Sequence, residues 1–108
     1  MSKIGGHSVR GSSTGRPIMV LLDLLGQRWV LRILWELSSS RANFRTLRKR
    51  CDDASPTILN KRLKELRDLH LVDLNEQGYG LTEMGNELAQ QFTMLHLWAE
   101  SWAKKIDD

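Results

Sequence analysis

The sequence predicts a mainly α-helical fold that carries one small β-hairpin. Apolar residues recur at helical spacing in five stretches of the 108-residue chain. The segment 71–82 instead alternates apolar and polar residues around "NEQG", which has the chemistry of a tight turn. The predicted order is therefore four helices, the hairpin and a last helix. The third and fourth helices are separated by a short break, and with the hairpin directly after them they predict a winged helix-turn-helix.

The N-terminal residues 1–16 are rich in Gly and Ser and poor in large apolar side chains. Such a segment buries too little surface to offset the entropy of ordering it, so we predict a flexible arm. Its bases Lys3, Arg10 and Arg16 could touch DNA, but they are sparse, and a tail without function is the plainer interpretation. Residues 17–106 are predicted to form one domain for DNA binding and dimerisation.

The first two helices are predicted over 17–25 and about 27–37, with Gly26 between them. Pro17 suits a first helical turn. The 17–25 stretch is apolar on nearly every side, so more than its own small domain must cover it. The second helix ends at a run of three serines.

The third helix is predicted over 42–51, with Asn43 as its N-cap and Phe44 and Leu47 pointing inward. "DDASPT" then breaks the helical pattern. Ser55 is the predicted N-cap of the fourth helix, and Pro56 is its first residue. This helix runs to about His70. Its apolar face has i, i+4, i+7 spacing and consists of Leu59, Leu63 and Leu66.

The last helix is predicted over roughly 83–105 with Thr82 as its N-cap, and it carries two apolar stripes. One stripe can pack on the helix's own domain, and the other then meets a second chain. The alternative is that both stripes are buried within the chain against 17–37. The predicted dimer contacts are Leu21, Leu88, Phe92, Leu95, Trp98 and Trp102.

Positive charge is concentrated in one part of the chain. The range 41–68 contains nine Lys or Arg and four Asp or Glu, a net charge of +5, whereas the rest of the chain carries −2. This asymmetry suits a polyanion better than a small acidic substrate. Double-stranded DNA is therefore the predicted partner.

The fourth helix has the pattern of a helix that enters the major groove. At about 100° per residue, its polar side lies opposite the leucine face. Thr57, Asn60 and Lys61 lie on the first two turns of that side and are the predicted base-contacting residues. The predicted phosphate contacts are Arg45, Arg48, Lys49, Ser55, Arg62 and Lys64. A charged helix face is more often only solvated, and it is the basic helix before it and the hairpin after it that favour DNA.

Three segments carry a resemblance to a known family. They are "LLDLLGQRWVLRILWEL", "FRTLRKRCDDASPTILNKRLKELRDLHLV" and "YGLTEMG". Over about residues 17–102 the chain resembles the HxlR-type winged-helix transcriptional regulators, which are relatives of the MarR type. The resemblance implies a homodimer that binds operator DNA as a repressor or an activator.

The sequence departs from that family at two places. Many members carry a cysteine just before the first helix's proline, used in some as a redox sensor. This chain has Arg16 there, so the resemblance gives no support for that mechanism. The wing is short and offers the acid Glu76 instead of bases. Wing contacts, if made, are predicted to come from Asn75 and Gln77.

Other chemistry has little support. The three bases before Cys51 could lower its pKa, while the acids at 52 and 53 oppose them, and a small residue at a helix end is the plainer interpretation. One cysteine forms no internal disulfide, which favours a reduced, cytoplasmic protein. The three histidines lack metal-ligand spacing, and we predict no metal, no cofactor and no enzyme activity. No secretory signal and no membrane-spanning stretch is seen.

Two alternatives remain at this stage. The tryptophans Trp29, Trp35, Trp98 and Trp102 could line a pocket for a small-molecule effector, although core and dimer packing explains them more plainly. Winged helices also serve as protein-interaction or assembly modules without operator specificity, because a fold does not determine a function. A stable monomer would favour such a module.

Overall fold

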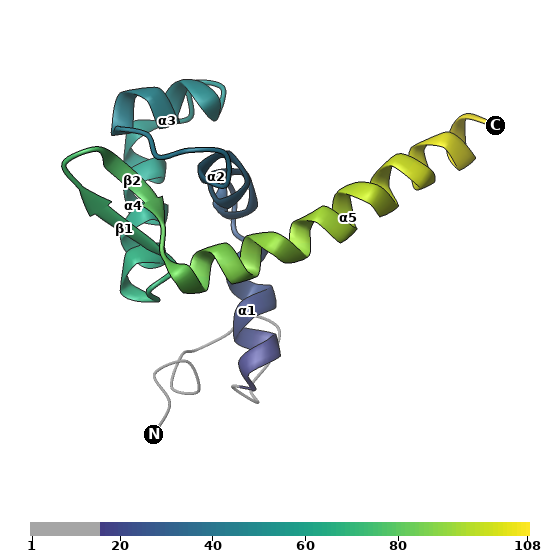
Figure 1. The fold of residues 1–108 in the computed structure, drawn as a ribbon, viewed down its shortest axis with the longest axis horizontal. Helices are drawn as coiled ribbons and strands as arrows, with labels where there is room; N and C mark the ends of the chain where they lie inside the picture. Colours follow the sequence, from purple (N-terminus) through teal and green to yellow (C-terminus); the bar gives the residue numbers. More distant parts are fainter. Residues whose placement is uncertain (1–15) are drawn as a thin grey trace.

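The computed structural model describes residues 16–108, which form five helices and one two-stranded hairpin (Figure 1). The predicted flexible arm lies outside the described residues, except for Arg16. The order of elements agrees with the sequence prediction. The elements are α1 (Pro17–Leu25), α2 (Val30–Leu37), α3 (Phe44–Arg50), α4 (Pro56–Asp68), β1 (Val72–Asn75), β2 (Gly78–Leu81) and α5 (Glu83–Asp107).

Two predicted N-caps are confirmed by their hydrogen bonds. The side chain of Asn43 accepts a 2.8 Å hydrogen bond from the backbone N–H of Thr46 at the start of α3. The Thr82 hydroxyl accepts from the N–H of Gly85 at 3.0 Å and begins α5. Each cap satisfies a backbone donor that the first helical turn leaves unpaired. Ser55 occupies the N-cap position of α4, but within the described residues its side chain makes no capping hydrogen bond.

The hairpin pairs β1 and β2 in antiparallel register from Val72 opposite Leu81 to Asn75 opposite Gly78. A single residue before α3 adds to it, because Ala42 exchanges two backbone hydrogen bonds with Tyr79, at 3.0 and 2.8 Å. The backbones approach so closely that a Cβ on Gly78 would lie 2.5 Å from the Ala42 carbonyl. The sequence did not predict this contact, since one paired residue leaves no periodic signal.

The core lies between α2, α3, α4 and the hairpin. The inward positions predicted for α4 are confirmed, because its three leucines are all buried. Leu47 of α3 is also fully buried, and Phe44 is partly buried against the same cluster. The largest fully buried side chains are Ile33, Leu34, Leu47, Leu59, Leu63, Leu66, Val30 and Cys51. The wing and both helices of the helix-turn-helix therefore share one apolar support.

Helix α5 is divided along its length rather than between two faces. Its first turns pack on the body, and its outer half extends away from it (Figure 1). Every residue from Thr93 to Asp108 is exposed. The alternative that both stripes are buried within the chain is therefore wrong for this outer half. Among the predicted dimer contacts, Phe92 is corrected, because it is 6% exposed and belongs to the core of its own chain. Leu21 and Leu88 are half-buried.

None of the helices in the described part of the chain combines the length and the apolar character that crossing a membrane requires.

Candidate nucleic-acid interface

The turn between α3 and α4 holds the two helices of the helix-turn-helix in a defined geometry. Asp52 and Asp53 both adopt left-handed backbone, with φ of 54° and 58°. Asp tolerates this conformation better than larger side chains do. The N–H of Asp53 donates to the Arg48 carbonyl at 2.9 Å, and Arg48 Nε donates to the Ala54 carbonyl at 2.7 Å. Arg48 therefore stabilises the turn with the side chain that was predicted to contact phosphate.

The predicted base-contacting residues lie together on the outer face of α4. Thr57, Asn60 and Lys61 are exposed, and the leucines behind them are buried. None of these three side chains makes a hydrogen bond within the part of the chain that the structure describes. Their donors and acceptors are free to meet base edges.

A basic hollow of about 270 Å³ lies between α3 and the start of α4. It is lined by Phe44, Arg45, Arg48, Lys49, Asp53 and Pro56. Arg45 and Lys49 are exposed and have no ion pair among the described residues, so their side chains can bind a phosphate. Ser55, also exposed, stands at the N-terminus of α4, where the helix dipole favours an anion.

Lys64 lies one turn beyond the base-contacting residues and is 79% exposed. Its ammonium group lies 3.4 Å from the Asp68 carboxylate, one helical turn along α4. An exposed pair of this kind is weak, so the lysine can exchange its partner for a phosphate at small cost.

Arg62 does not reach the surface that was predicted for it. Its side chain is 13% exposed, and it donates to the Arg28 carbonyl at 2.9 Å and to Gln27 Oε1 at 2.8 Å. The predicted phosphate contact is therefore corrected. The helical wheel contained the signal, because Arg62 lies about 60° from Leu59 and about 40° from Leu66.

Other bases of the 41–68 cluster are also engaged within the chain. Arg41 donates to the Gly78 carbonyl at 3.1 Å and pairs with Asp73, tying the start of α3 to the wing. Arg50 donates to the Ser40 carbonyl at 3.0 Å. The positive charge available to a partner is therefore smaller than the sequence count suggests.

Arg32 of α2 is a supporting residue that the sequence did not single out. It pairs with Glu36 at 2.7 Å and with Asp52 at 3.1 Å, and it donates to the Arg50 carbonyl at 2.6 Å. The hydrogen bond to Glu36 is the main cause that raises its pKa, so this cation is retained. These contacts hold the turn between α3 and α4 against α2.

One of the two polar side chains predicted to contact DNA from the wing, that of Asn75, makes a hydrogen bond within the hairpin turn. Asn75 Oδ1 accepts a 2.8 Å hydrogen bond from the backbone N–H of Gln77, so it shapes the tip. Gln77 and the acid Glu76 are exposed. Leu74 is 45% exposed. The wing tip thus offers Gln77 more readily than Asn75.

Cys51 lies in the core and not in a reactive surface position. It is fully buried, and desolvation by that burial is the main cause that raises its pKa. The bases that precede it along the chain do not overcome this effect. A protonated thiol is a poor nucleophile, so the plainer interpretation of a small packing residue is favoured.

The four tryptophans do not form one pocket. Trp98 and Trp102 stack on each other on the outer half of α5, with ring centroids 5.7 Å apart. The ring centroids of Trp35 and His96 lie 5.8 Å apart. Trp29 is half-buried at the start of α2. The predicted effector pocket shared by all four is therefore corrected.

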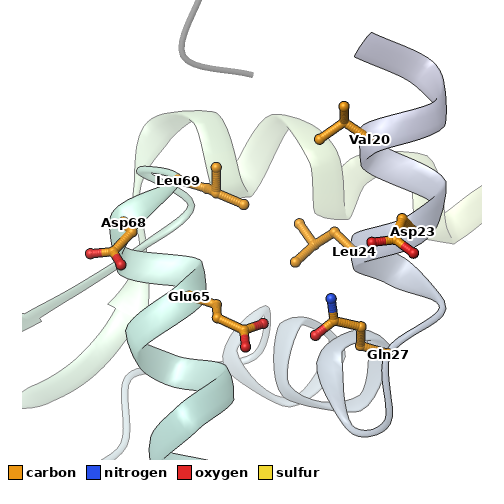
Figure 2. Close-up of a pocket in the computed structure, with 7 residues that line it drawn as sticks. All are labelled: Val20, Asp23, Leu24, Gln27, Glu65, Asp68 and Leu69. Carbon is orange, nitrogen blue, oxygen red and sulfur yellow. The ribbon is translucent and has the colours of Figure 1, made fainter. Parts of the chain in front are cut away.

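A second cavity of about 180 Å³ lies between α1 and α4, on the side of α4 that carries acids (Figure 2). It is lined by Val20, Asp23, Leu24, Gln27, Glu65, Asp68 and Leu69. The acidic lining of this cavity disfavours a polyanion there. Within the described residues, no group of three or more His, Cys, Asp or Glu could hold a metal ion.

Comparison with known proteins decides the family. The HxlR-like helix-turn-helix family model matches residues 24–107. The chain belongs to the HxlR-like helix-turn-helix family. The resemblance noted from the sequence is thereby confirmed, and this is a family of transcriptional regulators and not of enzymes.

Related HxlR-like proteins carry names of the same kind. The chain is 32% identical over 103 residues to the uncharacterized HTH-type transcriptional regulator MT3179 of Mycobacterium tuberculosis, covering 89% of this chain. It spans 62% of the length of that relative. It is 26% identical over 100 residues to the uncharacterized HTH-type transcriptional regulator YdeP of Bacillus subtilis, with 86% of this chain and 78% of the relative covered.

Solved structures of HxlR-like proteins have the same fold. The quinone-bound YodB from B. subtilis matches with a TM-score of 0.72 and 30% identity, covering 78% of this chain and 96% of that chain. A possible HxlR family transcriptional factor from Thermoplasma volcanium GSS1 matches with a TM-score of 0.69 and 30% identity, covering 78% and 82%. The winged helix-turn-helix predicted from the sequence is confirmed.

Proposed function

We propose that this HxlR-like chain is a homodimeric, sequence-specific transcriptional regulator that binds an inverted-repeat operator. The observation that carries the proposal is the exposed row of Thr57, Asn60 and Lys61 on the first turns of α4, a helix whose leucine face is buried. Each protomer would insert this end of α4 into a major groove. The two half-sites would lie about one helical turn apart, because the protein and the operator share a two-fold axis.

The three base-contacting residues have distinct chemistry. Asn60 can form the paired hydrogen bonds that adenine presents in the major groove. Lys61 can donate to guanine acceptors, and the Thr57 methyl and hydroxyl groups suit a thymine methyl or a polar base edge. Sequence preference would therefore depend on these side chains and not on the wing, whose tip carries an acid.

Phosphates would be bound on both sides of that row. Arg45 and Lys49 line the basic hollow of α3, and Lys64 lies further along α4. Ser55 adds a hydroxyl group at the N-terminus of α4. Arg48 contributes charge to the hollow while its Nε stays bonded to the turn. These contacts would position the protein without selecting a sequence.

The second protomer would cover the outer half of α5. Leu95, Trp98 and Trp102 are exposed there, as are Ile18 and Leu22 on α1. Large apolar surfaces of this kind mark interaction sites on soluble proteins. Leu21 and Leu88 lie half-buried beside them and would contribute at the edge. A regulator that must reach DNA and has one unpaired cysteine fits the cytoplasm.

Selection of bound sequences from random duplex DNA, followed by anisotropy titration at two salt concentrations, tests the proposal. An inverted repeat should emerge. With about three or four phosphate contacts per protomer, log K should fall against log salt with a slope of roughly −5 to −7. A protein that stays monomeric and binds no selected DNA would instead support the interaction-module alternative.

We also propose a small-molecule effector, at a site that contains Trp35 but not the other three tryptophans. A largely apolar hollow of about 370 Å³ is lined by Leu31, Arg32, Trp35, Phe92, Leu95 and His96. Its aromatic walls suit a planar ligand, and the structural neighbour YodB is quinone-bound. Titration with a simple quinone should quench a saturable part of the tryptophan fluorescence, and that part should be missing in Trp35→Phe. Unchanged fluorescence removes this part of the proposal.

A further inference from the structure

Arg62 connects the DNA-contacting helix α4 to the segment between α1 and α2. Its Nε donates to the backbone carbonyl of Arg28, and its Nη1 donates to the side chain of Gln27. Nη1 also lies 3.2 Å from Glu65 Oε1 on the next turn of α4, which holds the guanidinium in place. A planar guanidinium with several directed donors fixes orientation in a way that apolar contacts do not.

The segment that Arg62 holds is conformationally strained. Trp29, which follows the two bonded residues, has φ of 77° and so adopts left-handed backbone. A bulky side chain persists there only when its surroundings determine it strongly. The two residues that accept hydrogen bonds from Arg62, Gln27 and Arg28, immediately precede Trp29. They therefore help to determine the direction in which the chain passes from α1 to α2.

Helix α1 is anchored to the core near its C-terminal end. Of its nine residues Val20 and Leu24 are buried; Leu24 belongs to the core cluster and Leu25 packs against it. Its exposed residues Ile18 and Leu22 belong to the surface assigned to the second protomer. The polar contacts of Arg62 lie directly after this anchored end, where they can fix the orientation of α1 relative to α4.

We propose that Arg62 is a positioning residue that sets the angle between α4 and α1 and thereby selects the half-site spacing that the dimer accepts. This inference rests on the proposed function, because spacing has meaning only for a dimer on an inverted repeat. One added base pair shifts a half-site by about 3.4 Å and rotates it by about 35°. A rigid α1–α4 unit cannot follow that change, whereas a released one can.

The test compares wild type, Arg62→Met and Arg67→Met on the selected operator, on operators with one base pair added or removed between half-sites, and on a single half-site. Arg67 is the matched control, since it is exposed on the same helix and its side chain makes no hydrogen bond among the described residues. Both variants lose one positive charge, so a general electrostatic effect cancels. Melting curves and circular dichroism establish that each variant is folded.

Wild type and Arg67→Met should lose on the order of tenfold or more in affinity when the spacing changes, because one half-site then loses its base contacts. Arg62→Met should lose less than about threefold, with its preference among half-site sequences unchanged. Arg62→Met that keeps the wild-type spacing preference overturns the inference and leaves the proposed function standing. Wild type that binds no inverted repeat overturns both.

A second variant covers the case in which Arg62→Met does not fold. Gln27→Leu removes one acceptor of Arg62 and leaves α4 unchanged. Amide hydrogen exchange in this variant should accelerate over residues 19–30 and stay constant in α3. Unaltered exchange over 19–30 would show that the contact does not hold the segment, and would overturn the inference without any DNA being present.

Discussion

Replacement of Trp98 by alanine tests whether the outer half of α5 is the dimer interface. Trp98 is 63% exposed and stacks on Trp102 with ring planes 18° apart. If a tryptophan presents about 250 Å² of surface, roughly 150 Å² of Trp98 is available to a partner, worth about 4 kcal/mol at ~25 cal/mol per Å². That is an upper limit, because association does not recover the full area.

A smaller value than this limit is therefore expected for each Trp98 side chain that Trp98→Ala removes. Truncation of an interface hot spot costs about 2 kcal/mol or more, and a symmetric dimer loses the side chain twice. A total of about 4 kcal/mol raises the dissociation constant about a thousandfold. Sedimentation velocity over a dilution series measures this shift directly.

The matched control for Trp98→Ala is Leu74→Ala. Leu74 is a comparably exposed apolar side chain on the wing, away from α5. It should leave the dimer constant unchanged, and both variants should keep the helical circular dichroism of the wild type. A wild-type protein that sediments as a monomer, or a Trp98→Ala variant with the wild-type dissociation constant, refutes the assignment of this surface.

Further substitutions test the interface and the core. Asn60→Ala should cost about 1–3 kcal/mol of binding free energy at one base pair. Lys49→Ala should weaken binding to all sequences and reduce the steepness of log K against log salt by about one per protomer. Equal losses of affinity across sequences from both variants would contradict these roles. Because burial raises the pKa of Cys51, the folded protein keeps the thiol while the unfolded chain ionises. Stability should therefore fall as pH rises above about 8.5, and urea titrations should show less of that fall in Cys51→Ala. Gly85→Ala should destabilise by about 1–3 kcal/mol in thermal unfolding, since its Cβ would lie 2.0 Å from the Leu71 carbonyl oxygen; a stabilised variant would mean that helix propensity outweighs the clash.

The sequence by itself determined the elements and the face that each presents. The caps at Asn43 and Thr82 depend on short-range hydrogen bonds, and the leucine face of α4 depends on helical spacing. Both are local properties, so they can be predicted without knowledge of neighbouring elements. The exposed position of Asn60 follows from the same periodicity.

Tertiary structure decided which of the long charged side chains remain available. Arg62 and Lys61 are neighbours in the sequence and carry the same charge. One is held by the α1–α2 connection, which lies 34 residues away along the chain, and the other is free at the surface. A long side chain bonds to whatever acceptor the fold brings within reach, and helical spacing alone does not contain that information.

The same reason explains the last helix. Its two apolar stripes predicted two partners, but the fold separates the partners along the helix, with Phe92 in the core and Trp98 in solvent. The two stripes show that the helix is apolar on two sides, and this is a local property of the sequence. Where the body ends beneath a helix of 25 residues depends on the size and packing of all the other elements, and only the tertiary structure determines it.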